Sequence, residues 1–511
     1  MYVVTGDEMH QIDRYTMNEI GLTEVALMES AGQAFCRQLE PTLKKQDKII
    51  ILIGSGNNGG DGFVIGRILK EDYNVDVWVI PPEHKIRGAA LAHMKIYEKS
   101  GYDWFSYAKQ REETIELNLN NYTIVIDSLL GTGVQGTPRS PYRELITKMN
   151  ETNGTIISVD IPSGIPAHEG EVRPIGVKAH ETYTFQSAKM SAFCFPTANY
   201  YGKISVLPIG IPNKAFTQVN AARKVISEDT VKNTLAKRMP DAHKGSVGKG
   251  LIIGGAKEMV GAPVLTTEAS LRSGVGLVTL AVPDVIHPIV SQKVTEALFL
   301  PLATKNGQIC ANEFISNISL NRFDCIAIGP GLGRKERYKF YPIFSSFHGP
   351  IIIDADGLYH LSKELREWRN GRPEGPTIIT PHPGEMAMLT GLSIQEVEKQ
   401  RFKVSKEFAM KFQMYVVLKG PYTIVTTPSG EQWVNTTGNA SLAKGGSGDV
   451  LTGMIVAFLL QHHDTVSAIT NAVYIHGKAA DELVKTYDIF SVTATDLINE
   501  LPVVIRSIRY R

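Results

Sequence analysis

Cysteine is scarce in this chain of 511 residues. There are only four, Cys36, Cys194, Cys310 and Cys325. None belongs to a CxxC pair or stands at ligand spacing from a histidine, so neither a disulfide framework nor a structural zinc site is expected. This usage fits a protein of the reducing cytoplasm.

Long apolar runs are absent as well. The first residues, MYVVTGDEMHQIDRYT, are too polar for a secretory signal peptide. The most apolar late stretch, residues 450–460, has 11 residues and is too short to cross a bilayer. We expect a buried helix there and no association with a membrane.

The chain has no excess of charge of either sign. Lys and Arg number 53 and Asp and Glu number 52, a net charge of +1. Such a balance gives no bulk electrostatic reason to expect nucleic acid or a membrane surface as a partner. Apolar residues make up 43% and charged residues 21%, as in ordinary globular proteins with sizeable cores.

Short apolar runs alternate with helical patterns, which is typical of parallel sheets covered on both faces. The first series of predicted strands is 49–53, 75–80, 123–127 and 155–160, with helices to about residue 69 and near 88–99. The second series is 250–255, 276–282, 325–329, 350–354, 377–380 and 415–420, and two long helices, about 446–460 and 464–486, finish the chain. The junction lies within 207–230, which begins with a segment rich in proline and glycine. We predict two α/β domains, the larger one second.

A glycine-rich loop, GSGNNGGDG at 54–62, follows the first strand and opens a helix. Its five glycines let the backbone take positive φ and approach a ligand closely. The N–H groups at the start of the helix would face an anion. The spacing is neither that of a Rossmann loop nor that of a Walker loop. A tight turn without a ligand is the alternative, which the density of glycine and asparagine disfavours.

Two aspartates, Asp127 and Asp160, each end a predicted strand, and the glycine-containing segments 131–137 and 161–164 follow them. Ligands of open α/β sheets bind beyond the carboxyl ends of strands, so we expect three loops to converge on one site. Outside a site, such an aspartate is usually a cap or a turn former. Within one, it can hold a hydroxyl, move a proton or help to ligate a cation, and spacing alone does not choose among these roles.

The second half has its own glycine-rich segment, NASLAKGGSGDVLTG at 439–453. Gly445, Gly446 and Gly448 precede an apolar helix, and consecutive N–H groups in such a loop form an anion-binding nest. Asp449 then stands at the start of the helix, where the dipole stabilises its carboxylate. It could take a proton from a hydroxyl that attacks phosphorus, because phosphoryl transfer needs mainly positioning and charge stabilisation. The alternative is a simple helix cap.

Other loops fit the same site. KGPYT at 419–423 is expected to leave a strand with Lys419 and Gly420 exposed, and GPGLG at 329–333 looks like a loop of close approach. The three basic residues from 334 to 337 fit a solvated face better than a phosphate site. His382, between two prolines after a strand, is a candidate ligand residue.

Asp354 and Asp356 close the strand segment PIIIDADG. They fit a role beside a metal–nucleotide and a role in the turn equally well.

The first half is recognisable from GxGNNGGDG, from DSLLGTG at 127–133 and from SVDIPSG at 158–164. Over nearly all of residues 1–215 it closely resembles the NAD(P)H-hydrate epimerase family, which implies a Rossmann-like three-layer domain that interconverts the R and S forms of hydrated NADH or NADPH. The resemblance implies Asp160 at the reacting ring and a potassium ion held by Asn58, Asp127 and Ser163. The substrate-binding residues that it implies are Asn57, Asn58, Gly59, Gly60, Asp61, Gly131, Thr132, Gly133, Val134, Gln135, Gly136, Thr137, Tyr142 and Asp160. Oxygen-rich side chains at strand ends suit a hard cation.

The second half, from about residue 225 to 511, resembles the ADP-dependent NAD(P)H-hydrate dehydratase family, which has a ribokinase-like fold. The motifs are HKGSVGKGLIIGGA at 243–256, the segment 261–283, GPGLG, TPHPGEM and AKGGSGDVLTG. The resemblance implies that Ala262, Gly331, His382 and Asp449 bind the substrate and that Asp449 is the base. It implies nucleotide contacts from Lys419, Gly420, Pro421, Tyr422, Thr423 and Gly448. Two mild departures are Thr266 and Thr267, where alanines are usual, and an insertion-like stretch at about 366–376.

Together the two resemblances imply a metabolite-repair enzyme, both isomerase and lyase. The epimerase would supply the S form, and the dehydratase would return it to NAD(P)H with ADP as phosphoryl donor, giving AMP and phosphate. Magnesium is expected with the nucleotide, and self-association into a homo-oligomer is expected for such an enzyme. A small-molecule kinase fused to a nucleotide-binding module is the alternative.

Overall fold

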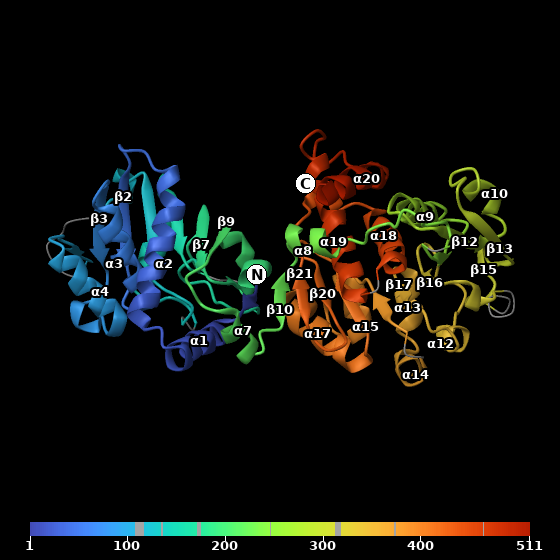
Figure 1. Ribbon diagram of the computed structural model, residues 1–511, viewed down its shortest axis with the longest axis horizontal. Helices are drawn as coiled ribbons and strands as arrows, with labels where there is room; N and C mark the ends of the chain where they lie inside the picture. The colour runs from blue at the N-terminus through green and yellow to red at the C-terminus, as the bar shows by residue number, and fades with distance from the viewer. Residues whose placement is uncertain are drawn as a thin grey trace. The chain divides into compact units, whose positions relative to one another are not determined.

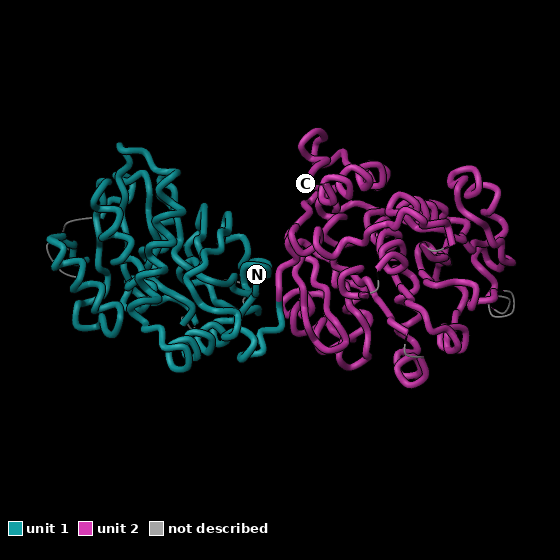
Figure 2. The backbone as a smooth tube through the Cα atoms, viewed as in Figure 1, with its two compact units in different colours: residues 1–223 teal, residues 224–511 magenta. Residues whose placement is uncertain are grey.

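The computed structural model describes residues 1–107, 117–133, 136–170, 175–245, 247–311, 318–372, 375–462 and 464–510. The chain divides into two compact units, residues 1–223 and 224–511 (Figure 2). Val134 and Gln135, two of the predicted substrate residues, lie outside the described residues.

Unit 1 is built on a seven-stranded sheet in the order β4-β3-β2-β5-β6-β7-β9, in which every neighbouring pair is parallel. The strands are β2 (Lys48–Ile53), β3 (Asn74–Val79), β4 (Phe105–Ser106), β5 (Ile124–Ser128), β6 (Thr155–Val159), β7 (Glu181–Phe185) and β9 (Lys203–Leu207). A separate parallel pair joins β1 (Val3–Val4) to β8 (Ala188–Lys189). The main helices are α1 (Gly6–Tyr15), α2 (Glu24–Leu39), α3 (Asn57–Leu69), α4 (Gly88–Lys99), α6 (Tyr142–Asn150) and α7 (Asn213–Gln218).

The sheet of unit 1 is covered on both faces. Phe35 of α2, Phe63 of α3 and Tyr97 of α4 are buried in one apolar cluster, and Leu145 and Met149 of α6 belong to a second. The central strands β2 and β5 are buried on both sides, which explains why their sequences are continuous apolar runs. The predicted three-layer arrangement is confirmed.

Unit 2 contains a ten-stranded sheet in the order β10-β21-β20-β19-β18-β17-β16-β11-β12-β13. The pairs from β13 to β19 are parallel, whereas β20 pairs antiparallel with both β19 and β21. The strands are β10 (Arg223–Val225), β11 (Lys249–Ile253), β12 (Leu277–Pro283), β13 (Leu298–Leu302), β16 (Cys325–Ile328), β17 (Ile351–Ile353), β18 (Thr377–Ile379), β19 (Tyr415–Leu418), β20 (Ile424–Thr426) and β21 (Gln432–Val434). A short hairpin joins β14 (Thr304–Lys305) to β15 (Gln308–Ile309).

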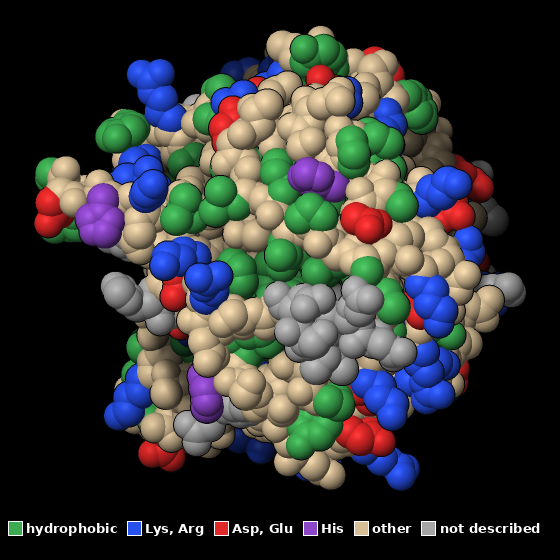
Figure 3. Space-filling model, turned by 90° about the vertical axis from the view of Figure 1, so that its right-hand side faces the viewer, with side chains coloured by type: hydrophobic (Ala, Val, Ile, Leu, Met, Phe, Trp, Pro, Cys, Tyr) green, Lys and Arg blue, Asp and Glu red, His purple; other side chains and the backbone are tan. Residues whose placement is uncertain are grey.

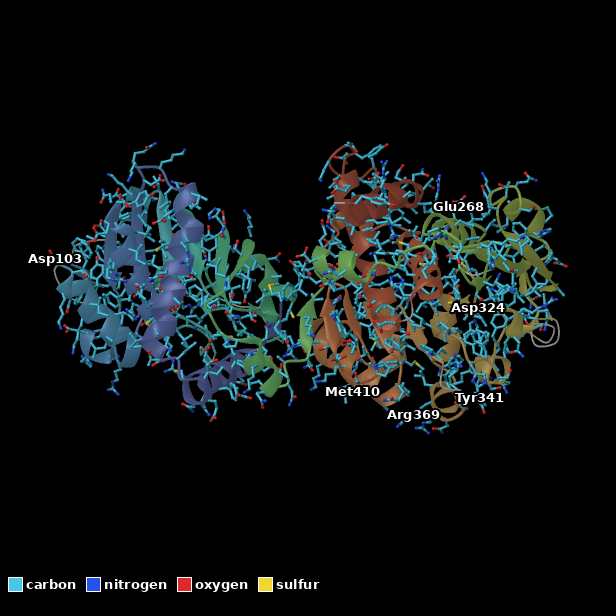
Figure 4. The ribbon with its side chains drawn as sticks, viewed as in Figure 1. Asp103, Glu268, Asp324, Tyr341, Arg369 and Met410 are labelled. Atoms are coloured by element: carbon cyan, nitrogen blue, oxygen red, sulfur yellow. The ribbon has the colours of Figure 1, made fainter. Side chains whose placement is uncertain are left out.

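Two layers of helices enclose this sheet (Figure 1). One layer holds α8 (Glu228–Thr234), α9 (Gly261–Arg272), α18 (Ser447–Gln461), α19 (Thr465–Leu483) and α20 (Ala494–Tyr510). The other holds α12 (Phe340–Phe344), α13 (Asp356–Leu361), α14 (Leu365–Gly371), α15 (Pro383–Thr390), α16 (Ile394–Lys399) and α17 (Arg401–Phe412), and α10 (His287–Val290) follows β12. Glu268 of α9 and Met410 of α17, labelled in Figure 4, mark the two layers.

The long apolar segment near the end of the chain is the buried helix α18, in which every residue from Val450 to Leu459 is buried. In the described ranges, none of the helices combines the length and the apolarity that a bilayer crossing demands.

The prediction that two helices finish the chain is wrong, because α20 follows α19. Its pattern is interrupted by Pro502, which lies inside the helix.

Candidate functional site

A cavity of about 630 Å³ opens in unit 1. The segments that follow β2, β5 and β6 contribute Asn58, Gly131 and Asp160 to its wall. Helix α1 contributes His10 and Asp13. The predicted convergence of three strand-end loops is therefore confirmed, and a helix from the start of the chain completes the enclosure.

The structure brings about half of the predicted substrate residues of unit 1 to the cavity wall. Those that line it are Asn57, Asn58, Asp61, Gly131, Thr132, Gly133 and Asp160. Tyr142 stands behind the wall, where burial raises the pKa of its phenol and a hydrogen bond with Ser55, a wall residue, opposes the rise. Gly59 and Gly60 are buried inside α3, and Gly136 and Thr137 do not line the cavity.

The glycine-rich segment opens a helix as predicted, but its glycines do not use the positive φ that they allow. None of Gly54, Gly56, Gly59, Gly60 and Gly62 adopts a positive φ. Helix α3 begins at Asn57, so most of these glycines are helical and serve close packing instead. A Cβ on Gly59 would lie 2.1 Å from the carbonyl oxygen of Gly54, and one on Gly54 would lie 1.7 Å from that of Leu129. The glycines let α3 press against the ends of β2 and β5.

Asp160 follows β6 in the left-handed region of backbone space, with φ of 62°. Its Oδ1 accepts hydrogen bonds from Lys189 Nζ at 2.5 Å and from the Phe185 N–H at 2.9 Å. The Lys189 side chain is 1% exposed and also donates to Thr184 Oγ1. A non-glycine residue in this conformation costs energy, and surrounding bonds must hold it there. The carboxylate is thus fixed at the edge of the cavity beside a buried cation.

Two further carboxyl groups face this ion pair. Burial raises the pKa of Asp13 to about 6, Lys189 lowers it, and Asp160 and Glu24 raise it. Burial, with Asp160 and Asp13 nearby, also raises the pKa of Asp61 well above its usual range. Asp61 was predicted, but Asp13 and Lys189 were not, because neither belongs to a glycine-rich motif. The sequence around Lys189 contains no motif that predicts a functional lysine.

The three residues predicted to hold potassium lie together. Ser163 Oγ donates to Asp127 Oδ1 at 2.5 Å and lies 3.3 Å from the Leu130 carbonyl oxygen. Asn58 Nδ2 donates to the same carbonyl at 3.0 Å, while Asn58 Oδ1 is buried without a hydrogen-bond partner. A buried acceptor of this kind needs a donor or a cation. Burial raises the pKa of Asp127, which hydrogen bonds from Ser163 and Ser158 oppose. The oxygen-rich set fits a monovalent cation.

The site of unit 2 is built at the start of α18. Gly446 has φ of 93° and caps the helix, and Asp449 is its third residue, so the predicted placement is confirmed. Burial raises the pKa of Asp449 to about 7, Asp354 and Glu385 raise it as well, and Lys419 lowers it. A carboxyl group with this pKa can gain and lose a proton near neutral pH.

Lys419 is not exposed as predicted but is the centre of an ion-pair network. Its Nζ lies 3.0 Å from Asp354 Oδ1 and 3.9 Å from Glu385 Oε2. Although burial opposes it, the pairing with Lys419 and a hydrogen bond from Thr452 lower the pKa of Asp354. Burial raises the pKa of Glu385 and Lys419 lowers it. Asp354 is therefore the ion-pair partner of Lys419, whereas Glu385 and Asp449 are biased toward protonation.

The loop 419–423, predicted to contact nucleotide, is supported from below by Arg401. This buried guanidinium donates to the carbonyls of Leu418, Lys419 and Tyr422 at 3.1 to 3.2 Å. A Cβ on Gly420 would collide with it, at 2.5 Å. One on Gly448 would lie 3.3 Å from Lys419 Nζ, so the loop and the start of α18 are adjacent. Arg401 was missed because only the fold shows which loop it holds.

The remaining predicted substrate residues divide into two places. Gly331 has φ of 64°, and a Cβ there would lie 3.3 Å from the Cβ of Ala262, so these two are neighbours. His382 caps α15, with its Nδ1 accepting from the N–H groups of Gly384 and Glu385. Because Nδ1 accepts, the proton of a neutral His382 ring belongs on Nε2.

The aspartate and the basic residues near the GPGLG loop form local contacts. Asp356 accepts from the Gly333 N–H at 3.0 Å and from Arg334 Nε at 2.7 Å, which favours the predicted turn role. Lys335 pairs with Glu258 at 2.8 Å.

His476 was not predicted. It is buried beneath the start of α18, bonded to the Ser447 carbonyl, and burial lowers its pKa to about 4.

Comparison with known families assigns each unit separately. Residues 250–503 match a family model described as NAD(P)H-hydrate dehydratase. Residues 24–191 match one described as the YjeF-related protein N-terminus. Helix α1 lies before the second match.

Whole-length relatives carry both units. The chain is 32% identical over 517 residues to a bifunctional NAD(P)H-hydrate repair enzyme of Moorella thermoacetica, covering 99% of this chain and 97% of that one. It is 32% identical over 514 residues to the same-named protein of Thermofilum pendens, covering 100% and 97%.

A solved structure resembles the second unit. It is the ADP/ATP-dependent NAD(P)H-hydrate dehydratase of Bacillus subtilis, co-crystallised with ATP and Mg²⁺. Sequence identity is 32% and the TM-score is 0.50, over 56% of this chain and 98% of that one. The ribokinase-like fold predicted for the second half agrees with this similarity.

Proposed function

Because the chain belongs to the family of bifunctional NAD(P)H-hydrate repair enzymes, we propose that its two sites divide the repair between them. Residues 1–215 form the epimerase domain and residues 225–511 the ADP-dependent dehydratase domain. The substrates are the hydrated forms of NADH and NADPH. The observation that carries this division is that each unit holds its own cluster of carboxyl groups around one lysine.

In unit 2, Asp449 is the base. The second substrate is Mg–ADP. Asp449 takes the proton of the ring hydroxyl while the hydroxyl oxygen attacks the β-phosphorus of ADP, and AMP leaves. The N–H groups at the start of α18 and the loop 419–423 position the phosphates. The nitrogen lone pair of the ring then expels phosphate, and loss of a proton from the next carbon restores NAD(P)H. Arg401 acts by holding the loop.

In unit 1, the cavity receives the hydrated nicotinamide, with Asp160 at the reacting ring. Asn57 to Asp61 and Gly131 to Thr137 bind the rest of the nucleotide, with Tyr142 at the border. Asn58, Asp127 and Ser163 hold a potassium ion. When bound there, the ion would supply a fixed positive charge, and the unpartnered Asn58 Oδ1 supports this placement.

Location and assembly are also part of the proposal. Few cysteines, all of them free among the described residues, fit a cytoplasmic protein. Basic and acidic side chains are interspersed on the face of unit 2 shown in Figure 3, which gives no single-sign surface for nucleic acid or a membrane. We expect the enzyme to self-associate.

The test is recovery of near-ultraviolet NADH absorbance from mixed epimers of hydrated NADH with magnesium, potassium and ADP. Full recovery, after subtraction of the spontaneous epimerisation measured with Asp160→Asn, supports both activities. If only the S fraction is recovered, unit 1 is not an epimerase. A stable phosphorylated product without NADH replaces the dehydratase assignment with that of a small-molecule kinase.

A further inference from the structure

The start of the chain forms one wall of the unit 1 cavity. Strand β1 pairs in parallel with β8, placing Val4 opposite Lys189. Helix α1 follows directly, begins with a capping box between Thr5 and Glu8, and carries His10, Asp13 and Arg14 to the cavity. Because β1 ends directly before Thr5, the N-cap of the helix, this pairing fixes the start of α1 relative to the buried lysine.

Several contacts hold α1 in this position. Arg223 donates to the Val3 carbonyl at 3.3 Å and forms an ion pair with Glu8. His10 Nε2 lies 3.3 Å from Thr132 Oγ1, on a predicted substrate loop, and a Cβ on Gly6 would lie 3.1 Å from the Thr132 carbonyl oxygen. The helix is thus anchored to β8 and to the loop that follows β5.

Asp13 is the carboxyl group that this wall presents. It lines the cavity together with Asp160, yet the two come from different elements. Lys189 bonds directly to Asp160, and no such ion pair is formed by Asp13 among the described residues. The charged and titratable groups that face Asp13 are Glu24 of α2, Asp61 of α3, Asp160 and Lys189, with His10 and Arg14 on its own helix.

Exchange of the two epimers needs two proton-handling groups. Hydration of the dihydronicotinamide ring places a hydroxyl on the carbon next to the ring nitrogen. Inversion at that carbon begins when the hydroxyl takes a proton. The C–O bond then breaks, water leaves, and the lone pair of the ring nitrogen forms a C=N bond. A water then adds from the opposite face and gives up a proton. One acid and one base suffice, on different sides of the ring.

We propose that Asp13 is a second catalytic residue of the epimerase, acting with Asp160 as an acid–base pair that carries one proton between them. In one direction Asp13 protonates the leaving hydroxyl, and Asp160 accepts the proton of the incoming water. In the reverse direction the roles exchange, so the pair is ready for the opposite epimer after each turnover. This inference rests on the epimerase function proposed above for unit 1.

The pH dependence follows from the shared proton. The competent form holds one proton on the pair, so the rate falls as the pair loses it. Burial raises the pKa of Asp13 to about 6, and epimer exchange should therefore decline as the pH rises above this value. Because the equilibrium between the epimers does not depend on pH, both directions decline together.

The experiment uses the full chain with Asp13→Asn, Asp160→Asn and the control Asp7→Asn, an exposed aspartate of the same helix. Epimer exchange is followed by chromatography from pH 5 to pH 9, with the spontaneous rate subtracted. We expect Asp13→Asn to lose about 10²-fold in kcat, with little change in KM and without the decline above pH 6. Asp13→Glu should recover part of the rate, and Asp7→Asn should match the parent chain.

Dehydration of the pure S epimer by unit 2 of the same chain reports that each variant is folded. Full exchange activity and an unchanged pH profile in Asp13→Asn, while Asp160→Asn is inactive, overturn the role of Asp13 alone. Full activity in both variants overturns the epimerase site itself. A rise in KM with unchanged kcat and pH profile in Asp13→Asn would make Asp13 a substrate-binding residue and also overturn the proposal.

Discussion

The two units place the same ingredients in different arrangements. In each, one lysine faces three carboxyl groups: Lys189 faces Asp160, Asp13 and Asp61, and Lys419 faces Asp354, Glu385 and Asp449. The lysine bonds directly to one of them, Asp160 in unit 1 and Asp354 in unit 2. The pKa of the other two is raised in both units, with burial as the main cause.

The difference lies in where the paired carboxylate stands. Asp160 lines the open cavity, whereas Asp354 is 1% exposed and is bonded to Thr452 beneath the site. In unit 1 the ion pair lies in the cavity wall, and in unit 2 it lies next to Asp449, for which no ion pair is found among the described residues. The position of the lysine therefore decides which carboxyl group forms the ion pair.

The largest expected effect comes from removing the unpaired base of unit 2. Asp449→Asn cannot accept the proton of the ring hydroxyl, and ADP-dependent dehydration should fall by about 10³-fold or more. Nucleotide binding, measured by calorimetry, should persist. Epimer exchange in the same chain is the control. Turnover close to that of the parent would refute the assignment of Asp449.

A smaller loss is expected from the paired carboxylate of unit 1. Asp160→Asn leaves Lys189 without its counter-charge and removes one half of the acid–base pair. Epimer exchange should fall by about 10²- to 10³-fold, while dehydration of the S epimer stays intact. The matched control is Thr184→Val, which removes a neighbour of Asp160 without removing its charge. Retained exchange in Asp160→Asn would take the residue out of catalysis.

The third prediction is that the two activities change with pH in opposite directions. Asp449 must be ionised to act as a base, and its pKa is about 7 because of burial and the neighbouring carboxylates. The kcat/KM for dehydration should therefore fall about tenfold per pH unit below that value. Epimer exchange should instead decline on the alkaline side. A pH profile measured on each pure epimer checks both, and equal slopes would contradict the contrast.

The smallest effect is expected from removing potassium. A cation at Asn58, Asp127 and Ser163 binds only the folded unit, so it raises the melting temperature of unit 1. At ten times its Kd, potassium should raise Tm by about 3–6 °C over a buffer with a bulky organic cation. Asn58→Ala should abolish this shift. Asn57→Ala, whose side chain instead bonds to Glu24, should keep it, and a shift that survives in Asn58→Ala would place the ion elsewhere.

Much of the scaffold could be predicted because buried parallel strands have a strong local signal. Runs such as Ile49–Ile53 and Ile351–Ile353 are apolar without alternation, and both are central strands. The strand-end aspartates Asp127 and Asp160 were found because glycine-rich segments follow them. Asp449 was found for the same reason. Local pattern therefore identified the loops of both sites.

What could not be predicted depends on contacts distant in sequence. Lys189 reaches Asp160 across 29 residues, and Arg401 supports a loop about 20 residues away. Asp13 shows its role only once α1 is folded over the loop after β5. The glycines of α3 were expected to shape a ligand loop, but they serve the packing of a helix on a sheet. Composition cannot separate these two uses of glycine, because both need a missing side chain.

The pairing of β1 with β8 also governs when the first site can exist. Val3 and Val4 must meet Ala188 and Lys189, a sequence separation of 185 residues. Such non-local contacts close late, because the entropy of a long loop must be overcome before they form. On a ribosome, the α1 wall lacks its contact with β8 until residue 189 has emerged. The cavity of unit 1 is therefore assembled only when nearly the whole unit has been synthesised, while its central strands can pair earlier.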